Sequence, residues 1–226
     1  MRPNRVQKQV CRLAVAEALG EAEAEVILRE TGIGDLPDLL PAGPRDLDAL
    51  FAELRPFADL YRAVLVRAGR EMALAVARRA IVHSGLIGHA HDAAARRLGP
   101  GGAPRAAQGL SLTSPPPPGF AADPDEVQRQ FEAAMRFFSC EGRLLAYTPA
   151  YVRFHVTGCN WCRAMERAGV PELIPFFCET DERFMDGHPT HRLLRPTAIG
   201  LGDAHCDFQF VPKATGDTTH REGCTS

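Results

Sequence analysis

The hydrophobic positions in the first part of the chain repeat with the period of an α-helix. Val6, Val10 and Leu13 lie about one helical turn apart, so their side chains share a face. Gly20 weakens this run, because glycine has a low helix propensity. The same period returns further along the chain. We therefore expect residues 1–98 to form a helical region whose main role is packing.

Two further helices are predicted within this region, after a segment of turn-forming residues. Residues 31–44 are rich in glycine, proline and aspartate, which predicts turns. The amphipathic run 46–55 follows, and we expect Pro56 to interrupt or restart the helix, since proline cannot donate a backbone hydrogen bond. From residue 58 to about 98, apolar and charged residues occupy separate helical faces, which predicts a long helix.

The segment 99–120 separates the two halves of the sequence. It contains four consecutive prolines and several glycines, a composition that suits neither a helix interior nor a central strand. We predict a linker or a long surface loop here. The alternative, a ligand for a proline-binding partner, rests on the four prolines alone.

The second half of the sequence begins with a helix and continues with alternating residues. In 123–126, Asp-Pro-Asp-Glu combines an N-cap, a proline suited to the first helical position and an acidic third residue, so we predict a helix from 124 to about 139. In 151–157, Val, Phe and Val alternate with Arg, His and Thr, which predicts a half-buried strand. The segment 143–148 is expected to pair with it.

The remaining pattern completes an α+β fold. The predicted elements are two helices followed by two strands: 160–168, 171–185, 193–200 and 206–211. The resulting order predicts a small antiparallel sheet packed with helices, preceded by the N-terminal helical region. We therefore expect an α+β domain over 121–212, followed by a loose tail over 213–226.

Composition and charge narrow the class of protein. The 226 residues are 45% hydrophobic and 24% charged, which is typical of a globular protein. The net charge of −2 argues against a nucleic-acid binder, since such proteins usually carry a basic excess. No stretch has the length of a membrane helix, and the first residues lack a secretory pattern. We therefore expect a cytoplasmic protein with neither nucleic acid nor membrane as a partner.

Seven cysteines in a chain of this kind argue against a disulfide framework. Cys159 and Cys162 form a CxxC pair at a predicted strand-to-helix junction, an arrangement that suits a redox pair or half of a zinc site. No second CxxC accompanies it. Ordinary buried thiols are therefore the interpretation that the spacing favours.

A second cysteine lies beside a carboxylate. Cys178 and Asp181 are three positions apart on a predicted helix, so they share a face. A carboxylate near a thiol can relay a proton or orient a substrate amine. Phe176 and Phe177 make the surroundings apolar, which strengthens electrostatic interactions. The alternative is a core thiol with a solvated carboxylate.

Two other candidates lie further along the chain. His188 and His191 have a spacing that can chelate a metal, but Pro189 argues against a regular helix, and surface-loop histidines are the alternative. Cys206 shares one face of a predicted strand with Phe208 and Phe210. We expect its thiol to point into the interior that the Cys178 thiol also reaches.

Several of these segments together resemble the L-2-amino-thiazoline-4-carboxylic acid hydrolase family. The likeness lies in the Cys159 segment, in the Cys178–Asp181 pair and in the Gly-Asp-x-x-Cys-x-Phe-x-Phe sequence at 202–210. It covers about residues 125–212, with a weaker helical likeness before them. The resemblance implies hydrolysis of a small cyclic amidine or thiazoline, with cleavage of a non-peptide C–N bond.

Two mechanisms suit such a reaction. In the first, the Cys178 thiolate attacks the amidine carbon, Asp181 holds the amidinium and relays a proton, and Cys206 or His188 is the second acid or base. In the second, water attacks directly, with Asp181 as the base and the thiols lining the site. The residues expected to bind the substrate are Arg195, His155 and Trp161.

The same C-terminal pattern is also similar to 4-vinyl reductase-type domains of ligand-sensing regulators, some of which bind zinc through cysteines. Ala198 stands eight positions before Cys206, where such a zinc site has a thiolate. We therefore expect no cofactor and no tightly bound metal, with zinc as the alternative. This likeness implies a second function, a small-ligand or zinc-binding sensor without catalysis. It also implies a homodimer, whereas the expected partner of the hydrolase is a small-molecule substrate.

Overall fold

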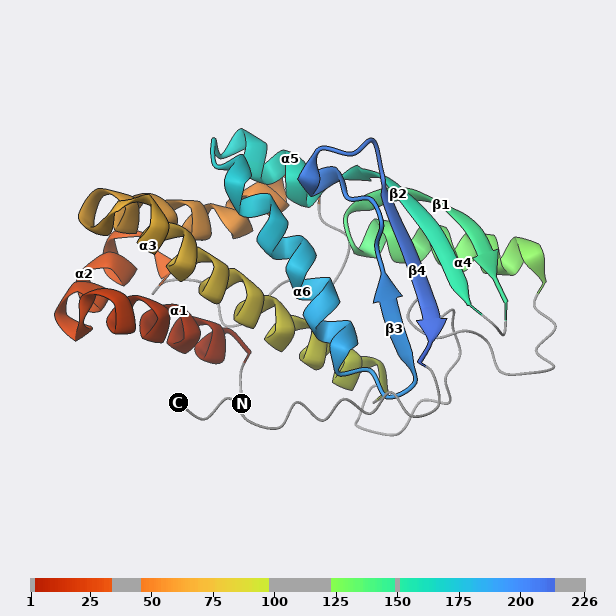
Figure 1. The fold of residues 1–226 in the computed structure, drawn as a ribbon, viewed down its shortest axis with the longest axis horizontal. Coiled ribbons are helices and arrows are strands. Elements are labelled where there is room, and N and C mark those ends of the chain that lie inside the picture. The colour runs from red at the N-terminus through yellow and green to blue at the C-terminus, as the bar shows by residue number, and fades with distance from the viewer. Residues whose placement is uncertain (1–2, 34–45, 98–122, 149–150, 214–226) are drawn as a thin grey trace.

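The computed structural model describes residues 3–33, 46–97, 123–148 and 151–213. These residues form six α-helices and a four-stranded antiparallel sheet, which confirms the predicted α+β class. The N-terminal helices lie at one side of the molecule and the sheet lies at the other, with α6 between them (Figure 1). Within the described residues, no helix is both long and apolar enough to cross a lipid bilayer.

The N-terminal region contains three helices: α1 (Pro3–Leu19), α2 (Glu21–Glu30) and α3 (Leu47–Arg97). Gly20 separates the first two at a φ of 90°, a conformation that L-residues rarely adopt. Gly20, which weakens the helical pattern in the sequence, therefore interrupts the helix in the structure. Both α1 and α2 pack against α3, and their buried faces form one apolar core with it.

The predicted break at Pro56 is wrong, because α3 continues through this proline. The non-helical backbone lies instead at Gly69, with φ 81° and ψ 174°. Proline removes one backbone donor yet keeps a φ that a helix tolerates, whereas a positive φ has no place in a right-handed helix. Gly69, rather than Pro56, therefore divides α3 into two helical parts.

The predicted linker over 99–120 lies outside the described residues, and so do 34–44 and the tail beyond residue 213. The division into two regions therefore stays a prediction. The apolar core that contains α1, α2 and α3 also includes Met165 and Leu173 from the second half of the chain, both fully buried. The two halves thus share a core where the structure describes them.

The helix α4 (Pro124–Phe137) starts as its capping sequence predicts. The Asp123 carboxylate accepts a hydrogen bond from the backbone N–H of Asp125 at 3.1 Å, and Pro124 occupies the first turn. Phe131 and Met135 form the buried face of this helix. They pack on the sheet that follows in the sequence.

The sheet has the strand order β1-β2-β4-β3, and all neighbouring strands are antiparallel. Its strands are β1 (Cys140–Tyr147), β2 (Val152–Cys159), β3 (His191–Leu194) and β4 (Cys206–Pro212). The hairpin β1–β2 and the strand β4 confirm the alternating pattern. The predicted strand over 193–200 is wrong beyond Leu194, where the chain forms a turn and then the 3₁₀ helix η3 (Ile199–Leu201).

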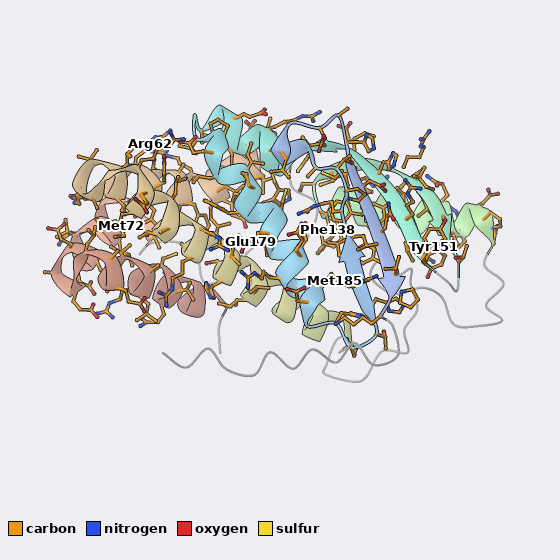
Figure 2. The ribbon with its side chains drawn as sticks, viewed as in Figure 1. Arg62, Met72, Phe138, Tyr151, Glu179 and Met185 are labelled. Atoms are coloured by element: carbon orange, nitrogen blue, oxygen red, sulfur yellow. The ribbon has the colours of Figure 1, made fainter. Side chains whose placement is uncertain are left out.

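The remaining helices lie in the sequence between β2 and β3, and they pack against α3. They are α5 (Asn160–Arg167), the 3₁₀ helix η2 (Pro171–Leu173) and α6 (Ile174–Asp186). In Figure 2, Glu179 on α6 lies on the side of α3, and Arg78 of α3 donates two hydrogen bonds to it at 2.7 and 2.6 Å. Met185, near the C-terminal end of α6, is buried against the sheet.

One face of the sheet carries the apolar side chains. Phe154 of β2 packs edge-on against Phe131 of α4, with ring centroids 5.5 Å apart, and stacks on Phe208 of β4 at 5.1 Å. Because side chains alternate along a strand, Cys206 lies on this same face and Asp207 lies on the other. Both α4 and α6 pack on the apolar face.

Candidate active site

Five cysteines from five different elements lie together at one end of the sheet, and all are free thiols. We refer to them as the thiol cluster: Cys140, Cys159, Cys162, Cys178 and Cys206. The first begins β1, the second ends β2 and the last begins β4, so antiparallel pairing brings these three ends together. The helices α5 and α6 supply the other two. Each thiol interacts electrostatically with others of the cluster.

Cys159 is the centre of this cluster. It pairs directly with Cys140 across the β1–β2 hairpin and is also the N-cap residue of α5. Hydrogen bonds from the Cys140 and Cys162 thiols lower the pKa of Cys159, against the opposing effect of burial. The backbone N–H groups of Trp161 and Cys162 lower this pKa further, without forming a regular cap hydrogen bond. The geometry thus favours a thiolate at Cys159.

The pKa values of Cys140 and Cys162 shift in the opposite direction to that of Cys159. Hydrogen bonding to Cys159 raises the pKa of Cys140, and it also raises the pKa of Cys162. Burial adds to both increases. Cys140 and Cys162 therefore keep their protons.

A strained turn positions this part of the cluster. Ser139 has a φ of 58°, a left-handed conformation that is costly for a residue other than glycine. Its carbonyl oxygen accepts a hydrogen bond from the Asn160 N–H at 3.2 Å, which joins the start of β1 to the start of α5. The Phe138 carbonyl accepts bonds from Trp161 Nε1 at 2.9 Å and from the Cys140 thiol at 3.4 Å. Trp161 therefore borders the thiol cluster.

Cys178 lies on α6 beside a buried arginine. Arg195 has a side chain that is 4% exposed, and its Nη2 donates to the Cys178 carbonyl oxygen at 2.9 Å. The same guanidinium forms ion pairs with Asp181 at 3.4 Å and with Glu182 at 2.6 Å. Burial raises the pKa of the Cys178 thiol to about 12, although the charge of Arg195 opposes this shift. Cys178 is therefore a neutral thiol at physiological pH.

The turn before β4 positions Cys206. The Asp203 carboxylate accepts a hydrogen bond from the Ala198 N–H at 2.8 Å, and Gly202 takes the left-handed conformation at φ 97°. The Ile199 N–H then donates to the Cys206 sulfur at 3.2 Å. Burial raises the pKa of Cys206, so this thiol is also neutral. The Gly-Asp-x-x-Cys sequence thus folds a turn that directs a thiol into the cluster.

Gly200 in the same turn lies against Cys178. A Cβ atom at this position would be 3.1 Å from the Cys178 sulfur and 2.6 Å from Cγ2 of Ile174. Only a residue without a side chain lets η3 approach α6 this closely. The approach brings the β4 turn and its Cys206 to the side of α6 that carries Cys178.

The structure brings Cys178, Asp181 and Cys206 together with Arg195 beside them, but not His188. This histidine follows α6, ten residues after Cys178, which corresponds to about 15 Å along a helix axis. Its Nδ1 accepts hydrogen bonds from the backbone N–H groups of Thr190 and His191, at 3.4 and 3.1 Å. It therefore organises the turn into β3.

His155 lies on the opposite face of the sheet from the thiol cluster. Its ring stacks near His205 with centroids 4.0 Å apart, and its Nε2 is 3.6 Å from Oδ1 of Asp207. Arg153 donates two hydrogen bonds to the same carboxylate, at 3.0 and 2.8 Å. Burial lowers the pKa of His155. The sheet thus separates His155 from Cys206, and its role in substrate binding stays a prediction.

The sequence left metal binding as an alternative role for the CxxC cysteines and for the two loop histidines. Among the residues that the structure describes, no group of three or more His, Cys, Asp or Glu side chains is arranged to hold a metal ion. The expectations that the protein needs no cofactor and binds no zinc stay predictions. The described residues of the site supply the five thiols, the carboxylates of Asp181 and Glu182 and the guanidinium of Arg195.

The sequence profile of the L-2-amino-thiazoline-4-carboxylic acid hydrolase family matches residues 50–210. The chain belongs to this family. The match begins inside α3 and ends at β4, so it includes the long helix as well as every element that contributes to the thiol cluster. The name of the family describes a hydrolase. No curated protein and no solved structure matches the chain significantly.

Cys140 is the member of the cluster that sequence reasoning missed. It falls where the pattern predicts the end of a helix, at 139, rather than the start of a strand. The predicted hairpin is the sequence signal that could have revealed Cys140. In an antiparallel hairpin, residues at equal distances from the turn lie opposite each other, and this symmetry relates Cys140 to Cys159.

Proposed function

We propose that this protein hydrolyses a small cyclic amidine or thiazoline, with 2-amino-thiazoline-4-carboxylate as the reference compound. Membership of the hydrolase family supports the class of reaction. The observation that carries the proposal is the position of Asp181, whose partly exposed carboxylate lies beside the buried thiols and is anchored by Arg195. This arrangement offers an accessible base next to a largely apolar surface.

The charges around Asp181 suit a cationic substrate. An amidinium is a planar cation with N–H donors, and a carboxylate binds it through charge-assisted hydrogen bonds. The Asp181 side chain is 37% exposed, whereas that of Arg195 is 4% exposed, so the anion is on the outside and the cation is on the inside. Arg195 contacts Glu182 at 2.6 Å, more closely than it contacts Asp181 at 3.4 Å. Of the two carboxylates, Asp181 is thus the one held less closely by Arg195.

The protonation state of Cys178 favours the mechanism in which water attacks. A thiol whose pKa is about 12 is a poor nucleophile at neutral pH. In the proposed mechanism, Asp181 accepts a proton from the water molecule that attacks the amidine carbon. A tetrahedral intermediate results, and its C–N bond then breaks.

The departing nitrogen needs a proton, and the neutral thiols can supply it. Burial keeps the protons on Cys178 and Cys206. Cys178 lies on the same helix as Asp181, three residues before it. Cys178 donates its proton to the leaving amine as the C–N bond breaks. The proton that Asp181 took from water then returns to the Cys178 sulfur, so that the site is restored after each turnover.

A turnover assay on the full chain tests the proposal. The purified protein is stripped of metal with a chelator and incubated with 2-amino-thiazoline-4-carboxylate, and the product is identified by mass spectrometry as substrate plus one water. We expect turnover by the metal-free protein. If the compound binds without being consumed, the protein is a sensor of small ligands and the proposed hydrolysis is wrong.

A further inference from the structure

We propose that Cys159 and Cys162 form a redox-active pair, in which Cys159 attacks a low-molecular-weight disulfide and Cys162 completes the exchange. The activity is separate from hydrolysis and does not rest on the proposed function. Its basis is the arrangement of three thiols at the junction of β2 and α5. Cys140 lies opposite Cys159 across the β1–β2 hairpin, and Cys162 lies in the first turn of α5.

The backbone holds the two cysteines within reach of each other. Cys159 is the N-cap of α5 and Cys162 is the third residue of its first turn, and an N-cap side chain naturally approaches that position. The opposite pKa shifts of the two thiols, downward at Cys159 and upward at Cys162, accord with this proximity. Ala164 and Met165, both fully buried, fix α5 in the core, so the turn that carries Cys162 is anchored.

The surroundings of Cys159 favour its thiolate, which is the reactive form in disulfide exchange. The neighbouring thiols of Cys140 and Cys162 lower the pKa of Cys159, and so do the N–H groups in the first turn of the helix that Cys159 caps. Cys159 is half-buried, whereas Cys162 is 4% exposed. An attacking thiol must meet its substrate and a resolving thiol need not, so this difference in exposure suits the two roles.

Cys162, rather than Cys140, is the partner that the geometry favours. The Cys140 thiol also donates to the Phe138 carbonyl, and its backbone is fixed by strand pairing and by the strained Ser139. A bond from Cys159 to Cys162 closes a four-residue loop within one helical turn. It leaves the β1–β2 hairpin intact.

The exchange is balanced in two steps. The Cys159 thiolate attacks one sulfur of the small disulfide, which forms a mixed disulfide and releases one small thiolate. That thiolate takes the proton of Cys162, whose sulfur then attacks Cys159 and displaces the second small thiolate. The cysteine pair is oxidised by two electrons, and the small disulfide is reduced to one thiol and one thiolate, which takes up a proton from water.

Peptide mapping after equilibration with oxidised and reduced glutathione tests the pair. The full chain is quenched with acid, its free thiols are alkylated, and disulfides are identified by mass spectrometry. We expect a Cys159–Cys162 disulfide in the wild type and in the matched control Cys178→Ser. In Cys162→Ser the reaction should stop at a glutathione adduct on Cys159. An adduct on another cysteine, or a Cys140–Cys159 disulfide in the wild type, would overturn the proposal.

A second measurement uses the wild-type chain alone, so it does not depend on a variant folding. Iodoacetamide labelling is followed for each cysteine at pH 7 and pH 5. An ordinary thiol loses about 100-fold in rate over this range, because its thiolate fraction falls about tenfold per pH unit. Cys159 should lose less than about threefold, because its thiolate persists. A loss of about 100-fold at Cys159, or no labelling of it at all, contradicts the proposal. Neither measurement involves turnover, so the result is independent of the hydrolase proposal.

Discussion

Arg195 donates a hydrogen bond from Nη2 to the backbone carbonyl oxygen of Cys178 at 2.9 Å, which ties the segment after β3 to the middle of α6. The same buried guanidinium forms ion pairs with Asp181 and Glu182. One cation thus connects the thiol cluster to the carboxylates at its border. Both the stability of this region and the ionisation of Cys178 depend on it.

Replacing Arg195 by glutamine should therefore have two measurable effects. The free energy of unfolding should fall by about 1–3 kcal/mol, because the charge-assisted hydrogen bonds of a buried group are lost. The exposure of Asp181 and Glu182, 37% and 52%, keeps the effect below that of a fully buried ion pair. Urea denaturation measures this change. Alkylation of Cys178 should also need a higher pH, because Arg195 favours its thiolate.

Arg192→Gln is the matched control for this experiment. Arg192 lies on β3 and is exposed, so its replacement should change stability by less than about 0.5 kcal/mol. Equal stability losses in the two variants would show that the contacts of Arg195 contribute nothing specific.

Two glycine-to-alanine substitutions should have opposite signs. Gly200→Ala places a methyl group 2.6 Å from Ile174 and 3.1 Å from Cys178, so we expect a loss of about 1–3 kcal/mol from overpacking. Gly88→Ala lies in α3 with no atom within 4 Å of the new Cβ, and alanine there should add up to about 1 kcal/mol. Thermal unfolding of both variants makes the comparison. A stable Gly200→Ala would mean that η3 and α6 are not in close contact.

Stability should fall as the pH falls below about 6.5, partly because of His155. Burial lowers the pKa of this histidine in the folded protein, next to His205, Arg153 and Arg143. The unfolded chain therefore binds a proton more readily, and stability is lost as the pH falls from the unfolded pKa through the folded one. The negative charge of Asp207 opposes this shift without cancelling it.

His155→Gln removes this contribution. The difference between the urea midpoints at pH 7.5 and pH 5.5 should be smaller in the variant than in the wild type. It should not vanish, since burial also lowers the pKa of His188 and that of His191. An unchanged or larger difference in the variant would show that His155 does not contribute to the pH dependence.

Local patterns predicted several single elements correctly, although they placed the break in α3 at Pro56 and not at Gly69. The cap before Pro124 and the alternation over 151–157 correspond to α4 and to β2. The pattern failed where a side chain just outside the segment decides. Residues 195–200 were expected to continue the strand, yet the Asp203 carboxylate accepts a hydrogen bond from the Ala198 N–H and folds them into a turn. Nothing within the segment itself indicates that bond.

The candidate site was predictable only in part. Cys178 and Asp181 share a helical face by spacing alone, and Cys206 was expected on an inward strand face. Their approach to Arg195 depends on how the segment after β3 packs on α6, which spacing does not determine. The central position of Cys159 depends on the register of the β1–β2 hairpin, which places Cys140 beside it.

The hydrolase account depends most directly on the carboxylate of Asp181. The decisive measurement is kcat on 2-amino-thiazoline-4-carboxylate for Asp181→Asn, compared with Asp186→Asn, an exposed aspartate at the end of the same helix. We predict that Asp181→Asn lowers kcat by about 10²- to 10⁴-fold, the usual effect of removing a general base, while Asp186→Asn retains the wild-type value. An Asp181→Asn protein with the wild-type kcat would contradict the account.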